Sequence, residues 1–209
     1  METDMTLHYE ELVQDRTNEF FYMLRDLLNE EDKRRVEYAL RFAKAAHDDQ
    51  KRKTGEPYIL HPIAVARIVA VELELGANPI IAALLHDVVE DTHYTIEDIR
   101  ERFGDDVAFL VGVVTKQKKD QYEVSKQVDN FKQMLDSVHY DIRALLLKLS
   151  DRLHNMRTLS SMRPDKQMKI AGETDYFYAP LANRLGLYKI KTELENLSFR
   201  FRCPANLQV

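Results

Sequence analysis

Cysteine, tryptophan, glycine and proline are all scarce in this sequence. Its 209 residues include one cysteine, no tryptophan, 6 glycines and 6 prolines. The single Cys203 has no second cysteine with which to form an intramolecular disulfide, which favours a reducing compartment. Glycine and proline interrupt helices, and apolar residues here mostly recur at spacings of three and four. We therefore predict an all-helical fold.

The sequence also lacks a long uncharged apolar run and an excess of positive charge. No segment reaches the length of a membrane span without charges, and the N-terminus, with Glu2 and Asp4, lacks the basic and apolar blocks of a secretory signal. The net charge of −5 argues against a broad surface for nucleic acid, although a small cationic cluster can still bind one anion. We expect a cytoplasmic protein with no membrane or nucleic-acid partner.

Length and composition indicate an ordinary globular chain, with 44% apolar and 31% charged residues. A chain of this length can bury a sizeable core, so we expect a single domain over residues 1–209. Within it, residues 1–29 form an N-terminal helical extension that packs loosely or against a partner.

Residues 78–92 are the most unusual stretch, because an apolar helix there acquires a histidine and three carboxylates. Asn78 suits the N-cap and Pro79 the first helical position. At about 100° per residue, four polar residues share one arc of this helix: His86, Asp87, Glu90 and Asp91. The rest of the circumference is apolar, so we expect both the helix and its polar stripe to be buried. Buried carboxylates need a cation or a hydrogen-bond network, and a metal ion is the simplest solution.

Other helices are indicated by apolar periodicity, caps and prolines. A capping box at Thr95 and Asp98 begins a short helix that Gly104 ends. His47 lies on the apolar stripe of its segment, where a core or helix-end histidine is the expectation. Gly76 is the expected stop of the helix that begins at Pro62. The remaining segments are the helices 31–50, 62–75, 128–138 and 141–161, an apolar segment 107–114, a helix from residue 164 that bends or ends at Pro180, an amphipathic segment 188–201, and loops at 51–62 and 116–127.

The 141–161 helix carries Asp151, Asn155 and Thr158 at spacings of i, i+4 and i+7, which places them on one narrow face. His61 lies at or just before the start of the helix that begins at Pro62. With it there are four candidate metal ligands on three helical elements: His61, His86, Asp87 and Asp151. Two imidazoles and two carboxylates suit a borderline or hard divalent ion such as Mn²⁺, Fe²⁺ or Zn²⁺.

These four residues resemble the H…HD…D pattern of the HD-domain metal-dependent phosphohydrolases, an all-helical superfamily. More narrowly, four ordered motifs resemble the hydrolase domain of RelA/SpoT homologues. They are RKTGEPY at 52–58, HDVVEDT at 86–92, KLSDRLHNMRT at 148–158 and YAPLANRLG at 178–186. The resemblance covers most of the chain and implies a helical bundle of the HD type.

The resemblance also implies an activity. That family hydrolyses the alarmone (p)ppGpp of the stringent response, removing its 3′-pyrophosphate to leave GDP or GTP plus pyrophosphate, usually with Mn²⁺. It implies that Mn²⁺ is bound by His61, His86, Asp87 and Asp151. It implies that Glu90 and Asp91 are the catalytic carboxylates, which can also hold a second ion. It implies substrate contacts from Arg52, Lys53, Thr54, Asn155 and Thr158.

Three departures from the family pattern stand away from the proposed metal: Asn183 in place of histidine, Thr54 in place of serine and Gln117 in place of an apolar residue. The intact His-Asp and Glu-Asp pairs favour an active enzyme. Two alternatives stay open, namely an HD phosphohydrolase of another nucleotide and a non-catalytic alarmone-binding regulatory module. Residues 188–209 resemble the region that leads into a synthetase domain, so the chain is expected to be either part of a longer synthetase/hydrolase or a stand-alone hydrolase.

Overall fold

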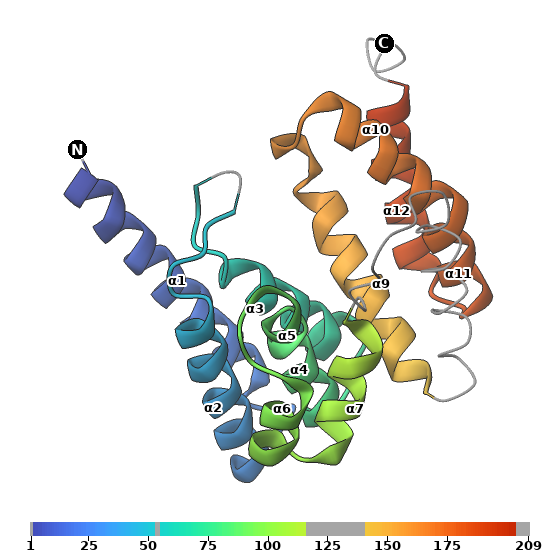
Figure 1. Cartoon of the computed structure of the whole chain (residues 1–209). Helices are drawn as coiled ribbons and strands as arrows, with labels where there is room; N and C mark the ends of the chain where they lie inside the picture. The colour runs from blue at the N-terminus through green and yellow to red at the C-terminus, as the bar shows by residue number, and fades with distance from the viewer. Residues whose placement is uncertain (1, 53–54, 116–140, 204–209) are drawn as a thin grey trace. The chain divides into compact units, whose positions relative to one another are not determined.

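The computed structural model describes residues 2–52, 55–115 and 141–203. Within these ranges the protein is helical and has no β-strand, and an isolated bridge pairs Lys51 with Pro57 (Figure 1). The prediction of an all-α fold is confirmed. The predicted loop 116–127 and helix 128–138, together with Lys53, Thr54 and Gln117, lie outside the described residues. None of the described helices is long and apolar enough to cross a membrane.

The chain divides into two compact units, Met1–Leu147 and Lys148–Val209. The boundary falls inside helix α9 (Ile142–Arg157), so the first residues of this helix belong to the first unit and its remainder to the second. The single domain expected over residues 1–209 therefore stays a prediction, and the two units are described separately.

The first unit is built around α4, which packs against α2, α3 and α7 (Figure 1). The side chains of Ile80, Ile81, Leu84 and Leu85 on α4 are fully buried, as its apolar sequence predicts. The helices of this unit are α1 (Glu2–Leu24), α2 (Glu30–Ala46), α3 (Leu60–Arg67), α4 (Ala77–Leu85), α5 (Val88–Asp91), α6 (Ile96–Phe103) and α7 (Asp105–Val114), and a π-helical turn, Ile68–Glu72, extends α3.

The N-terminal helix α1 was expected to pack loosely or against a partner. It packs instead against α3, and Val13, Phe20 and Leu24 are buried in the core of the first unit. The capping box of Thr95 and Asp98 at the start of α6 is confirmed, since both of its reciprocal hydrogen bonds are present.

The start of α4 differs from the prediction. Gly76, in extended conformation, is the N-cap of α4 rather than the stop of the preceding helix, which ends at Glu72. Asn78 is not the N-cap, because its side chain is used elsewhere. Its amide oxygen accepts a hydrogen bond from Arg35 at 2.6 Å, and its amide nitrogen donates one to Asp106 at 2.6 Å. These tertiary bonds join α2, α4 and α7.

The single helix predicted over 78–91 is also wrong, because it is interrupted. Helix α4 ends at Leu85, a turn of two residues holds His86 and Asp87, and α5 follows with four residues. Asp87 adopts φ −97° and ψ −7°, a bridge conformation that active-site residues often take.

The second unit contains the rest of α9, α10 (Pro164–Glu173), α11 (Ala179–Arg184) and α12 (Tyr188–Arg202). Leu149, Leu153 and Leu194 of this unit are fully buried. Pro164 begins α10 as predicted. The helix was expected to bend or end at Pro180, but α10 ends earlier, at Glu173, and a π-helical stretch, Thr174–Tyr178, follows it. Pro180 lies in the first turn of α11, where its missing N–H is tolerated.

Candidate metal centre

Two imidazoles approach one carboxylate oxygen in the first unit. His61 lies in the first turn of α3, and His86 and Asp87 form the turn between α4 and α5. The Nε2 atoms of His61 and His86 are 3.7 Å and 3.0 Å from Oδ2 of Asp87, and the two rings are 5.3 Å apart between centroids. The structure thus brings together three of the four predicted ligands.

The tautomer of the neutral His86 ring is set by a backbone carbonyl of the preceding helix. Its Nδ1 is 2.7 Å from the carbonyl oxygen of Ala83. A carbonyl can only accept, so Nδ1 carries the hydrogen of the neutral ring and Nε2 keeps the lone pair that a metal needs. Metal-binding histidines usually donate their second nitrogen in this way.

The electron pairs of these groups repel one another unless a positive charge lies between them. Nε2 of His86 lies 3.0 Å from Oδ2 of Asp87, and Nε2 of His61 lies 3.7 Å from the same oxygen. Each of these nitrogens can hold a lone pair that faces the carboxylate. A bound proton or a divalent cation satisfies this arrangement. The donor set, two nitrogens and a carboxylate oxygen, therefore fits a divalent metal.

Tyr58 holds the carboxylate at the middle of this cluster. Its hydroxyl donates a hydrogen bond to Oδ2 of Asp87, the same oxygen that faces both imidazoles. Tyr58 belongs to the RKTGEPY motif, but the sequence assigns it no role. Its contact with Asp87 spans 29 positions, so no local pattern could have revealed it.

The predicted catalytic carboxylates lie on α5, one turn beyond Asp87. Glu90 is half-buried and Asp91 is exposed, so the expectation of a fully buried polar stripe is wrong. The reason is the turn at residues 86–87. After it, α5 is only four residues long, and Val88 is its one fully buried residue.

His47 and Gln50 connect the end of α2 to α5. His47 caps α2 and is 2% exposed, which confirms the prediction of a core or helix-end histidine. Burial lowers the pKa of His47, partly offset by its bond to Gln50 and by the charges of Asp87 and Asp91, so the ring is neutral at pH 7. Gln50 bonds to Nδ1 of His47 through Oε1 at 2.8 Å and donates from Nε2 to the carbonyl of Asp91 at 2.9 Å.

The loop that begins after Gln50 with the cationic residues Lys51 and Arg52 is closed by backbone hydrogen bonds. The amide of Arg52 donates to the carbonyl of Glu56 at 2.8 Å, and the amide of Tyr58 donates to that of Gln50 at 3.0 Å. Gly55 lies at the turn with φ 88°, a left-handed conformation that favours glycine. Arg52 is half-buried. The loop therefore has a defined base beside Asp87, and Lys53 and Thr54 are outside the described residues.

In the second unit, Asp151 and Asn155 share one face of α9, as their spacing predicts. The amide of Asn155 donates to Oδ1 of Asp151 at 2.8 Å. Thr158 lies just beyond the end of α9, and its hydroxyl donates to the carbonyl of His154 at 3.0 Å. Asp151 as the fourth ligand stays a prediction.

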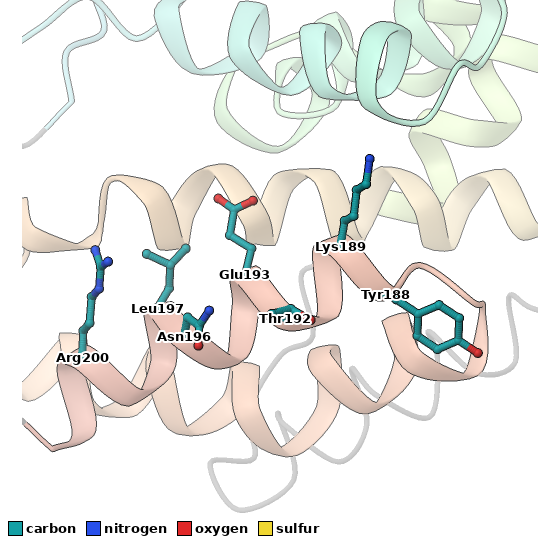
Figure 2. A pocket seen from close by; sticks show the side chains of 7 residues that line it. All are labelled: Tyr188, Lys189, Thr192, Glu193, Asn196, Leu197 and Arg200. Atoms are coloured by element: carbon teal, nitrogen blue, oxygen red, sulfur yellow. The ribbon is translucent and has the colours of Figure 1, made fainter.

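A surface hollow of about 630 Å³ borders α12 (Figure 2). The residues that line it are Tyr188, Lys189, Thr192, Glu193, Asn196, Leu197 and Arg200. Figure 2 shows Lys189 and Glu193 on one side of the helix and Tyr188 pointing away from them. Glu193 pairs with Nε of Arg157 at 2.7 Å. None of the predicted site residues lines this hollow.

Residues 39–188 match the model of the HD domain family. The chain belongs to the HD-domain family. The match includes every predicted ligand, catalytic and substrate-binding residue, and it confirms the fold class expected from the resemblance. An HD domain implies a divalent metal, which agrees with the donor set around Asp87.

Curated proteins similar to this HD-domain chain include the bifunctional (p)ppGpp synthase/hydrolase SpoT of Escherichia coli K12, which is 47% identical over 189 residues, covering 90% of this chain and 27% of the relative. A guanosine-3′,5′-bis(diphosphate) 3′-pyrophosphohydrolase of Aquifex aeolicus is 52% identical over 169 residues, covering 81% of this chain and 24% of the relative. The HD-domain chain thus spans about a quarter of the length of these relatives.

A solved structure is similar along most of its length. It is that of a metazoan ortholog of SpoT, described as hydrolysing ppGpp and acting in starvation responses. It superposes with a TM-score of 0.63 and 30% sequence identity, covering 81% of this HD-domain chain and 96% of the metazoan chain.

Proposed function

We propose that this chain hydrolyses (p)ppGpp at its 3′-pyrophosphate, giving GDP or GTP plus pyrophosphate. The observation that carries the proposal is the approach of the His61 and His86 Nε2 atoms to one oxygen of Asp87, at 3.7 Å and 3.0 Å. This arrangement occurs in a member of the HD-domain family, and similar proteins carry the name of that hydrolase. The activity would belong to the stringent response.

We propose Mn²⁺ as the metal, held by His61, His86, Asp87 and Asp151. The first three converge in the first unit, and Asp151 follows them in the H…HD…D order of the family. When bound, the ion neutralises charge on the phosphate and lowers the pKa of water. Tyr58 keeps Asp87 oriented for this role through its hydrogen bond to the carboxylate.

Glu90 and Asp91 are proposed as the catalytic carboxylates. They follow Asp87 by about one turn, and both are partly or fully accessible to solvent, as groups that meet a water molecule must be. One of them orients the attacking water and takes its proton, so that the water oxygen attacks the phosphorus bonded to O3′. The bond between that phosphorus and O3′ breaks, pyrophosphate leaves, and O3′ takes a proton to become the 3′-hydroxyl of GDP or GTP. The same pair could hold a second ion.

The substrate contacts are assigned to Arg52, Lys53, Thr54, Asn155 and Thr158. A planar guanidinium can stack on guanine and pair with phosphate, so Arg52 suits a nucleotide with several phosphates. The bond between Asn155 and Asp151 supports a shared role for that face of α9.

We propose that the binding partner is a small nucleotide and that this chain binds neither nucleic acid nor a membrane. We place the activity in the cytoplasm. The curated relatives are more than three times as long as this chain. We propose that any synthesis of (p)ppGpp in such a longer protein depends on residues outside this sequence.

The test is incubation of Mn²⁺-loaded protein with ppGpp, followed by chromatographic separation of the products and a parallel measurement of binding. We expect GDP and pyrophosphate. Tight binding of ppGpp without products would favour the regulatory module. Turnover of other nucleotides but not of ppGpp would favour a different HD phosphohydrolase.

A further inference from the structure

Helix α5 carries the two proposed catalytic carboxylates but is too short to hold itself in place. It has four residues, and one helical turn is unstable in isolation because its nucleation costs more than its few hydrogen bonds return. Its internal bonds join Asp91 N to Asp87 O at 2.9 Å and Thr92 N to Val88 O at 3.1 Å. Its position must therefore depend on contacts with other elements.

Two side chains from outside contact the two ends of α5. At its start, the hydroxyl of Tyr58 donates to the carboxylate of Asp87. At its end, Nε2 of Gln50 donates to the backbone carbonyl of Asp91 at 2.9 Å. A carbonyl in the last turn of a helix has no partner within the helix, so Gln50 supplies a bond that α5 cannot make itself.

Gln50 is oriented by a buried neighbour. Its Oε1 lies 2.8 Å from Nδ1 of His47, and His47 is fixed at the end of α2 by its backbone bond to Ala43 at 3.0 Å. Because the amide nitrogen of Gln50 faces Asp91, its oxygen must face His47 and Nδ1 must donate. The His47 ring also packs on that of Tyr58, with centroids 4.8 Å apart.

Gln50 and Tyr58 are also joined to each other. The amide of Tyr58 donates to the carbonyl of Gln50 at 3.0 Å, which closes the loop that carries Arg52. The two side chains that contact α5 thus extend from the two sides of one loop base, residues 50 and 58. A change in the backbone at this base moves both contacts at once.

We propose that Gln50 and Tyr58 are positioning residues, which fix α5 at both ends and couple the Arg52 loop to the carboxylates of Asp87, Glu90 and Asp91. The expected effect on turnover rests on the proposed function, whereas the fixing of α5 by Gln50 and Tyr58 does not depend on it. Substrate that contacts Arg52 then stabilises the loop base, and with it the placement of the carboxylates.

The experiment compares wild-type protein with Gln50→Met and Gln50→Glu by hydrogen exchange mass spectrometry and by steady-state kinetics with ppGpp and Mn²⁺. Methionine keeps the length of the side chain and removes both bonds. Glutamate keeps an oxygen for His47 but cannot donate to the carbonyl of Asp91. Asp49→Ala, at an exposed neighbouring position, is the matched control.

We expect the amides of residues 88–92 to exchange faster than in the wild type in both Gln50 variants. In Asp49→Ala we expect them to exchange at the wild-type rate. In the same variants kcat should fall about fivefold, the equivalent of one hydrogen bond of about 1 kcal/mol, with KM changed less than about twofold. Unchanged exchange at residues 88–92 in Gln50→Met would overturn the proposal, whatever the kinetics. If wild-type protein proves inactive on ppGpp while the exchange responds as expected, the proposed function fails and the positioning of α5 stands.

Discussion

Replacing Tyr58 by phenylalanine removes one oxygen atom and tests how the metal centre is organised. The hydroxyl donates to Oδ2 of Asp87, the oxygen that faces Nε2 of both His61 and His86. Phenylalanine keeps the ring and its packing on His47. The variant therefore isolates the hydrogen bond to the carboxylate.

The magnitude follows from the kind of bond that is lost. A hydrogen bond to a charged group contributes about 1.5 to 3 kcal/mol, and the Asp87 side chain is only 18% exposed, so solvent replaces it poorly. The bond also keeps the carboxylate oxygen facing both imidazoles, the orientation that a bound cation needs. We therefore expect Mn²⁺ affinity to fall about 10-fold to 100-fold, the range found when partners of metal ligands are removed.

The assay is a calorimetric titration of metal-free protein with Mn²⁺. Tyr176→Phe is the control, because Tyr176 is 77% exposed and its ring merely contacts its neighbour Phe177. We expect wild-type affinity in the control. An affinity of Tyr58→Phe within about twofold of the wild type would refute the role assigned to the Tyr58 hydroxyl, since any loss of this bond should exceed that change.

Three further outcomes are expected. Glu90→Gln should retain metal by elemental analysis but lose about 100-fold or more in kcat, because an amide cannot take the proton of water, and full activity would remove Glu90 from the mechanism. Hydrogen bonds from Arg143 lower the pKa of Asp106 below its usual 3.8, so this pairing stabilises the fold above that pH and is lost as the pH falls through the lowered value. The difference in urea midpoint between wild type and Asp106→Asn should accordingly be larger at pH 7 than at pH 3, and equal differences would contradict the pairing. Leu84→Ala, at a fully buried position of α4, should lower the free energy of unfolding by about 2 to 5 kcal/mol, and a loss under about 1 kcal/mol would contradict its place in the core.

Features determined by neighbouring residues were predicted well from the sequence. The capping box at Thr95 and Asp98 needs only residues within one turn, and both of its bonds are present. Pro164 begins α10, and the apolar run Ile80–Leu85 is the buried centre of the first unit. Periodicity and caps suffice where the forces are local or depend on burial alone.

Features that depend on distant partners were missed. Asparagine is a favourable N-cap residue, but the side chain of Asn78 forms hydrogen bonds with Arg35 and Asp106 instead. The N-cap of α4 is therefore Gly76. The turn after Leu85 follows no glycine or proline, so no local signal marks it. It makes α5 a separate element and leaves Asp91 exposed, where a continuous buried stripe was expected.

The candidate site was predicted in part for the same reason. His61, His86 and Asp87 were chosen by residue type and by resemblance, and they lie together. Gln50 contacts Asp91, 41 positions away, and Tyr58 contacts Asp87, 29 positions away. Helical periodicity relates residues only a few positions apart, so it cannot predict either contact. Such supporting residues become visible only when the fold brings the segments together.

The central claim is that the chain cleaves the 3′-pyrophosphate of (p)ppGpp, and the position of cleavage tests it most directly. The measurement uses ppGpp labelled in the terminal phosphate of the 3′-pyrophosphate, incubated with the Mn²⁺-loaded protein, and follows where the label goes. We predict that all of the released label appears in pyrophosphate, with GDP formed in equal amount. Label that appears in orthophosphate, or that stays in the nucleotide while ppGpp is bound, would contradict the account.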